Sequence, residues 1–255
     1  MKQRMMIAAL LIGLLMLTGC NLITYENEQV YTLDATDLDT LVISHEEGDV
    51  TITGVDGIDE VTVKATLAAV GEEEEGAKSF SEERLSVELT SEGKTGLLTT
   101  KVTKEAQKEQ GYIHLNIEVP SRLALDYKQN EGQLFVKGVK AGMKIHHGYN
   151  QLSLSDIEGD IELVDGTGVA TLVNVMGHIT LNKGSGEANV TNSTGDLTVT
   201  AGSGDVQISD HTGNITIRSG AGNINVSRVN GDVNVLEKNR GTIELTDITG
   251  TITQP

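Results

Sequence analysis

The sequence has few aromatic residues and a single cysteine, and each shortage disfavours a type of site or bond. Tryptophan is absent, and aromatic residues make up 3% of the 255 residues. Clefts that bind sugars or nucleic-acid bases commonly stack their ligands on aromatic rings, so this composition disfavours both kinds of cleft. One cysteine cannot form a disulfide within the chain. The fold must therefore be stabilised by its packed core.

Positive charge is also scarce. The chain has 19 lysine and arginine residues against 37 aspartate and glutamate residues, which gives a formal net charge of −18. Nucleic-acid phosphates require clustered lysine and arginine, and anionic lipid surfaces attract the same side chains. We therefore expect no nucleic-acid partner and no docking of the protein body on anionic lipid.

The first residues have the pattern of a secretory signal peptide. Lys2 and Arg4 precede an apolar run from Met5 to Leu17, which is followed by small residues. A basic start, a short apolar segment and a small-residue cleavage site are typical of such peptides. The run is shorter than the ~20 residues of a membrane-spanning helix. We expect residues 1–19 to be removed and the protein to be extracytoplasmic.

The end of this segment, Leu17-Thr18-Gly19-Cys20, resembles the lipobox of bacterial lipoproteins. In that family the cysteine receives a diacylglyceryl group and becomes the new N-terminus. The resemblance implies that Cys20 carries lipid and anchors the domain to the bacterial cell membrane without spanning it. A plain signal peptide with a chance cysteine is the alternative. Residues 20–29 are expected to form a short tether to the anchor.

From Gly132 onward, small turn residues recur every nine positions. Alternate turns differ in kind, so the true repeat has eighteen residues. One kind has a second glycine two positions earlier, as at Gly148, Gly166 and Gly184. The other has a mostly apolar residue there, as at Ile157 and Val175. An extra residue is expected near Asn239, because the last two turn glycines are Gly241 and Gly250.

Between the turns, apolar residues alternate with polar ones and recur at the same period. One such column begins Met143, Ile161, Ile179, and another begins Leu152, Ala170, Ala188. Strands of this pattern place their apolar side chains on one face, and stacked coils bury those faces together. We predict an all-β fold, a right-handed parallel β-solenoid with about 18 residues and two strands per coil. An antiparallel sandwich is the alternative, but it does not explain the alternating turns.

The regular solenoid is predicted over residues 121–255 and a less regular β region over residues 30–120. Pro120 marks the boundary, because a proline inside a strand removes a ladder hydrogen bond. Gly48-Asp49-Val50-Thr51-Ile52 already has the later repeat pattern, so both regions are expected to share one architecture. Residues 71–84, with the run Glu72 to Glu75, are expected to form a short helix or a loop.

A family resemblance supports this interpretation. Val119-Pro120 leads through Leu123-Ala124-Leu125 into repeated Gly-Asp-apolar-x-apolar units, which begin at Gly159, Gly195, Gly204 and Gly231. This pattern is similar to the bacterial putative-adhesin, or toast-rack, β-strand-repeat family of unknown function, over about residues 30–255. The resemblance implies an extracytoplasmic, often membrane-anchored repeat domain linked to adhesion or envelope sensing. It implies no catalytic residues.

No motif predicts a metal or cofactor. His146 and His147 are adjacent and offer only two ligands, so an exposed corner is expected for them. His211 is expected to be packed or half-exposed at an otherwise apolar corner. Asp160 directly follows its glycine, a register that differs from the calcium-binding nonapeptide. Such corner residues are expected to cap turns. A carbohydrate-active solenoid, hydrolytic or glycan-binding, remains the alternative function, with Asp160 and Glu162 as one possible acid pair.

One candidate interaction face remains. Thr180, Thr198 and Thr216 align at the eighteen-residue period, flanked by Asn182, Thr200 and Arg218. Threonine is also simply a favoured strand residue, so the alignment by itself is weak. The sequence predicts a non-enzymatic, lipid-anchored scaffold, adhesin-like or envelope-sensing, that binds an envelope protein or a glycan.

Overall fold

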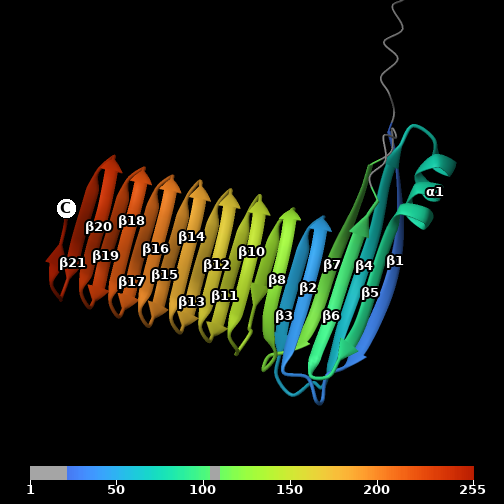
Figure 1. Ribbon diagram of the computed structural model, residues 1–255, viewed down its shortest axis with the longest axis horizontal. Coiled ribbons are helices and arrows are strands. Elements are labelled where there is room, and N and C mark those ends of the chain that lie inside the picture. Colours follow the sequence, from blue (N-terminus) through green and yellow to red (C-terminus); the bar gives the residue numbers. More distant parts are fainter. Residues whose placement is uncertain (1–21, 104–109) are drawn as a thin grey trace, which may run out of the picture.

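The computed structural model describes residues 22–103 and 110–255 of the chain. Its described part is almost entirely β-structure, folded into an elongated stack with one helix at the N-terminal end (Figure 1). The signal peptide predicted over residues 1–19 and Cys20 lie outside the described residues. Among the described residues, no helix is both long and apolar enough to cross a membrane.

The N-terminal region contains one helix and nine strands. The elements are β1 Ile23–Asp34, β2 Thr40–Glu47, β3 Val50–Val55, β4 Glu60–Gly71, α1 Glu74–Arg84, β5 Leu85–Glu92, β6 Thr95–Val102, β7 Gln110–Pro120, β8 Ala124–Glu131 and β9 Leu134–Lys137. The rest of the chain is a series of short strands. They are β10 Met143–Tyr149, β11 Leu152–Glu158, β12 Ile161–Thr167, β13 Ala170–Met176, β14 Ile179–Ser185, β15 Ala188–Thr194, β16 Leu197–Ser203, β17 Val206–Thr212, β18 Ile215–Ala221, β19 Ile224–Asn230, β20 Val233–Arg240, β21 Ile243–Ile248 and β22 Ile252–Thr253.

The strands form two sheets of eleven strands each. Sheet A has the order β1-β4-β7-β3-β9-β11-β13-β15-β17-β19-β21, and sheet B the order β22-β20-β18-β16-β14-β12-β10-β8-β2-β6-β5. From β8 onward all neighbouring strands are parallel, and successive strands alternate between the sheets. Met143 pairs with Ile161 and Ile161 with Ile179, so each coil advances by eighteen residues. The predicted parallel β-solenoid with two strands per coil is confirmed.

The earliest coil in the sequence lies inside the stack. Strands β2 and β3 form it, and they pair in parallel with β8 and β9 on one side. On the other side they pair in parallel with β6 and β7, which come later in the chain. Antiparallel pairs, β1 with β4, β4 with β7 and β5 with β6, then close the N-terminal end. The sheets are therefore continuous across Pro120.

This arrangement corrects the prediction that residues 20–29 form a tether. Residues 23–29 are the first part of β1 and pair antiparallel with β4. The half-buried residues of β1 include Tyr25, Asn27 and Gln29. These side chains are mostly polar. The exposure of the segment alternates as in a strand, but its sequence lacks the alternation of apolar and polar residues that would predict one.

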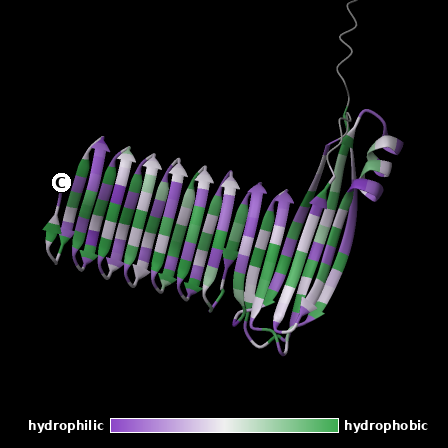
Figure 2. Cartoon of the chain, viewed as in Figure 1, coloured by the Kyte–Doolittle hydropathy of each residue, from purple (hydrophilic) through white to green (hydrophobic). Residues whose placement is uncertain are grey.

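The two kinds of strand bury their residues differently. Strands of sheet B alternate strictly, as in β10, where Met143, Ile145 and His147 all point inward. The regular strands of sheet A, β11 to β19, bury two residues, bend, and then bury one more. In β11 the bend is at Asp156, which has φ 55°, and it returns Ile157 to the core after Leu154. Figure 2 shows the resulting green and pale bands across the stack.

The turn glycines are required by the close stacking of coils. A Cβ built on Gly168 would lie 1.9 Å from the carbonyl oxygen of Asn150, one coil earlier. Gly168 also has φ +132°, a conformation that L-residues rarely adopt. The glycine column therefore reflects the spacing between coils.

The extra residue of the last coil lies earlier than expected. The register shifts between Ile217 and Arg218, where Arg218 pairs with Glu237. Leu236 is the inserted residue, and its side chain points out and is 43% exposed. A β-bulge absorbs one residue in this way without breaking the ladder.

Candidate functional site

The predicted interaction face lies on the outer surface of sheet B. Thr180 pairs directly with Thr198, and Thr198 with Thr216, on the adjacent strands β14, β16 and β18. Asn182 pairs with Thr200 in the next outward column. Thr180, Asn182 and Thr200 are exposed, and the other two are half-buried. The structure thus brings all five residues into two neighbouring columns of one flat face.

These five side chains make no hydrogen bonds to the rest of the described chain, nor to one another. Their hydroxyl and amide groups are therefore directed to solvent, at the spacing of ~4.8 Å between neighbouring strands. The threonine column ends at Glu162 on one side and at Asn234 on the other. The column of Asn182 and Thr200 ends at Val164 and at Arg218.

The opposite face, on sheet A, carries a second uncharged array that the sequence analysis did not predict. Its outward columns run from β11 to β19 and contain no charged residue: Ser153, Thr171, Asn189, Gln207, Asn225 in one, and Ser155, Val173, Thr191, Ser209, Ser227 in the other. The same eighteen-residue period would have revealed it. Both broad faces of the central coils are thus largely neutral in a strongly acidic chain.

Several acidic residues lie at the corners, where they join successive coils. Asp160 Oδ1 accepts the backbone N–H of His178, one coil later, over 2.8 Å. Asp196 and Asn214 continue the column, each accepting the backbone N–H of the residue one coil further on. The expected capping role is therefore realised between coils, not within one turn. No group of three metal-ligating side chains occurs in the ranges 22–103 and 110–255.

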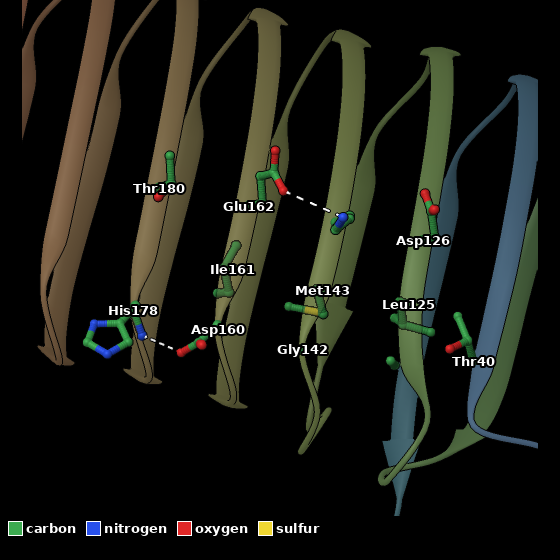
Figure 3. A pocket seen from close by; sticks show the side chains of 12 residues that line it. Thr40, Leu125, Asp126, Gly142, Met143, Asp160, Ile161, Glu162, His178 and Thr180 are labelled. Carbon is green, nitrogen blue, oxygen red and sulfur yellow. Dashed lines mark hydrogen bonds and ion pairs between the residues drawn. The ribbon is translucent and has the colours of Figure 1, made fainter.

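An open groove of about 730 Å³ crosses strands β2 to β14 and reaches the interaction face at Thr180. Figure 3 shows Asp126 and Glu162 on its outer side and Asp160 and His178 at the turn. The groove exists because Gly142 and Ala124 occupy the corner column that Asp160 and His178 fill in later coils, so no large side chain covers that part of the surface.

Two carboxylates of the groove, those of Glu162 and Asp160, already have partners. Glu162 Oε2 lies 3.9 Å from Lys144 Nζ, and Asp160 accepts the His178 N–H described above. Both carboxylates are thus engaged in contacts between coils. A hydrolytic pair would need one carboxyl group as a proton donor and a second as nucleophile or base.

The third inward column of sheet B is polar and fully buried from His147 to Lys183, contrary to the exposed corner expected for His147. In this column the side chains of His147, Asp165 and Lys183 are each 0% exposed. His147 Nδ1 lies 2.7 Å from Asp165 Oδ1, and Lys183 Nζ lies 2.7 Å from Asp165 Oδ2. The signal was present in the sequence, since polar residues recur there at the repeat period just before the turn glycines.

The same column continues toward the N-terminal end. Gln129 donates to the Gly48 carbonyl over 2.6 Å and accepts from the Tyr127 hydroxyl over 2.8 Å. His45 contacts the Thr100 hydroxyl through Nδ1 over 2.8 Å. Burial lowers the pKa of His45 from 6.5 to about 4. His45 is therefore neutral in the folded protein near neutral pH.

His211 lies in a different corner column, as expected, and is buried at 2% exposure. Its Nδ1 lies 2.8 Å from the hydroxyl group of Ser193, the residue at the same corner one coil earlier. These two polar residues therefore pair with each other in a mostly apolar column. Burial lowers the pKa of His211, which favours a neutral ring.

No family model and no curated protein matches the sequence. Several solved structures are similar in form. A putative cell adhesion protein from Clostridium sporogenes has a TM-score of 0.36 and 10% identity, over 87% of this chain and 99% of its own. A putative adhesin from Parabacteroides merdae has a TM-score of 0.36 and 10% identity, over 89% and 96%.

A putative lipid binding protein from Parabacteroides distasonis has a TM-score of 0.36 and 12% identity, over 89% of this chain and 97% of its own. Likenesses at this level transfer no function to this chain, and the solenoid assignment rests on the strand pairing described above.

Proposed function

We propose that this protein is a non-enzymatic binding scaffold, adhesin-like or envelope-sensing, anchored to a bacterial membrane by lipid on Cys20. The observation that carries the proposal is the interaction face on sheet B. Its five residues form two columns of hydroxyl and amide groups that no other described side chain engages.

The charge distribution supports a neutral or weakly polar partner. Most surfaces of a chain with net charge −18 repel acidic polymers. The five residues of the interaction face carry no charge, and the exposed Arg218 borders them beside Thr216. An uncharged partner surface, protein or glycan, could therefore contact it without burying an unpaired charge.

A photocrosslinking experiment tests this proposal. A photoreactive residue is placed at Thr198 on sheet B, with Thr191 on sheet A as a matched control, since both are half-buried threonines in parallel strands. We expect a discrete adduct from Thr198 and none from Thr191. Adducts from neither position would contradict a scaffold that binds through sheet B, and adducts from Thr191 alone would assign binding to sheet A.

The groove favours a second candidate, a glycan-binding or hydrolytic solenoid. Asp126, Asp160 and Glu162 line it together with Lys144, which gives a sugar both donors and acceptors. The double variant Asp160→Asn, Glu162→Gln should abolish any co-sedimentation with insoluble envelope polysaccharide, or its cleavage, if this function holds. Unchanged co-sedimentation would exclude the groove as the binding site.

A further inference from the structure

A lysine and an aspartate are held against each other inside the solenoid. Asp165 on β12 and Lys183 on β14 are direct neighbours in register. Their side chains are 0% exposed, with Lys183 Nζ 2.7 Å from Asp165 Oδ2. The ion pair Lys144–Glu162 on the outer face of the same sheet offers a contrast, because its side chains are 67% and 57% exposed and 3.9 Å apart.

The contact does not have the geometry of a hydrogen bond. Asp165 Oδ2 has no hydrogen-bond partner although Lys183 Nζ lies within 2.7 Å. The lysine nitrogen is instead aligned with backbone carbonyls, those of Ser185 at 2.5 Å and Gly166 at 3.5 Å. These carbonyls accept two of its protons and hold Nζ beside the carboxyl group.

The other oxygen of the carboxyl group contacts a proton donor. His147 Nδ1 lies 2.7 Å from Asp165 Oδ1, and His147 Nε2 lies 2.8 Å from the carbonyl oxygen of Gly132. A carbonyl only accepts, and so does an ionised carboxylate. While Asp165 is ionised, both ring nitrogens are satisfied at once only when each carries a proton, so Nδ1 is placed to donate a proton to Oδ1.

Two buried opposite charges are costly to keep, because each loses its hydration. The flanking residues of the strands, Leu163 and Leu181, are fully buried, so no water competes for the pair. In such surroundings proton transfer from the ammonium to the carboxylate gives a neutral amine and a neutral acid, since desolvation disfavours both charged forms. An amine and a carboxylic acid in contact are the reactants of an amide.

We propose that Lys183 and Asp165 condense into an intramolecular isopeptide bond, with His147 as the proton donor. Nζ, as the neutral amine, attacks Cγ of the protonated carboxyl group, and His147 Nδ1 gives its proton to Oδ1. Nζ then loses one proton to a departing hydroxyl group, which leaves as water. The remaining hydroxyl proton returns to His147. Overall one ammonium and one carboxylate become one amide and one water, so no oxidant, reductant or cofactor is consumed.

Peptide mapping of the full chain tests the proposal without depending on how the N-terminus is processed. Trypsin cuts an unmodified chain after Lys144, Lys183 and Arg218 and releases peptide 145–183. An amide on Lys183 removes that site. We expect instead a single peptide 145–218 that is lighter than its sequence by one water. Release of an unmodified 145–183 peptide from protein shown to be folded would overturn the proposal.

Two variants give further tests, with Glu162→Gln as the matched control. Asp165→Asn replaces water by ammonia as the leaving group, so its crosslinked 145–218 peptide should have the same mass as the wild-type one. His147→Gln should slow crosslinking after refolding by about 10²-fold, the typical contribution of a positioned proton donor. Glu162→Gln removes an exposed carboxylate from the same strand and should leave the crosslink intact. If a variant fails to fold, the wild-type map still decides.

Discussion

Asn192 donates a side-chain N–H to the side-chain oxygen of Asn174, one coil earlier, over 2.7 Å. Asn174 in turn donates to Asp156 Oδ1 over 2.8 Å. All three residues have φ between 53° and 57°. One column therefore combines the bend of the sheet A strands with a ladder of side-chain hydrogen bonds, which explains why Asn and Asp are favoured there.

Asn174→Ala should lower the free energy of unfolding by about 1–2 kcal/mol, because alanine tolerates this backbone conformation poorly and makes neither hydrogen bond. The control is Asn182→Ala, on the exposed face of β14, which should change stability by less than about 0.5 kcal/mol. Denaturant titration measures both. Equal effects would show that the ladder does not stabilise the bend.

Gly168→Ala should prevent normal stacking, because its Cβ would lie 1.9 Å from the Asn150 carbonyl oxygen. Gly93→Ala is the control, since Gly93 also has positive φ but no atom within 4 Å of the added Cβ. The control should lose only about 1 kcal/mol to backbone strain. Circular dichroism melting distinguishes the two, and similar melting curves would contradict the close stacking of coils.

Leu181→Asp should abolish folding, because it places an unpaired charge among fully buried residues of adjacent coils. The control, Asn182→Asp, changes the neighbouring outward side chain of the same strand and should fold normally. A cooperative melting transition for Leu181→Asp at the wild-type temperature would refute the inward assignment of this column.

Acid should destabilise the protein through His45. Its pKa is about 4 in the folded protein against an ordinary value of 6.5, so the unfolded chain binds the proton more tightly. Stability is therefore full above pH 6.5 and falls as the pH drops toward 4, by about 2 kcal/mol at about pH 5. Urea unfolding of wild type and His45→Gln at about pH 7.5 and about pH 5 isolates this contribution. The variant should lose less stability between the two values.

Cys20→Ser should release the protein from the membrane fraction if Cys20 is the lipidated residue, because anchoring of this kind depends on buried acyl chains. Phase separation in a detergent that clouds on warming gives the measurement. Thr18→Ser, a small change inside the same motif, is the matched control and should stay with the detergent phase. Retention of Cys20→Ser with the membrane would contradict a lipid anchor at this position.

The solenoid was predictable because its constraints repeat. Turn glycines and apolar columns recur at eighteen residues, and each coil repeats the same requirement for close stacking. The alignment of the interaction face was predictable from the same eighteen-residue period, since Thr180, Thr198 and Thr216 share one column.

The buried polar column was not predicted, for a physical reason. His147, Asp165 and Lys183 have side chains that are usually solvated, and only the pairing of three successive coils satisfies them together. The N-terminal order was also beyond the sequence, because β2 and β3 find partners on both sides from later segments. Nothing in a local pattern indicates such a non-sequential arrangement.

The strand pairing between regular coils repeats at the eighteen-residue period, and this makes the length of the rod adjustable by gene duplication. Insertion of one whole repeat keeps each glycine, corner and core residue above its counterpart, and extends the rod by ~4.8 Å. The N-terminal helix and antiparallel strands would be unaffected. Related chains could therefore differ in reach while they retain the same closed end, and the bulge at Leu236 shows that even a single inserted residue is tolerated.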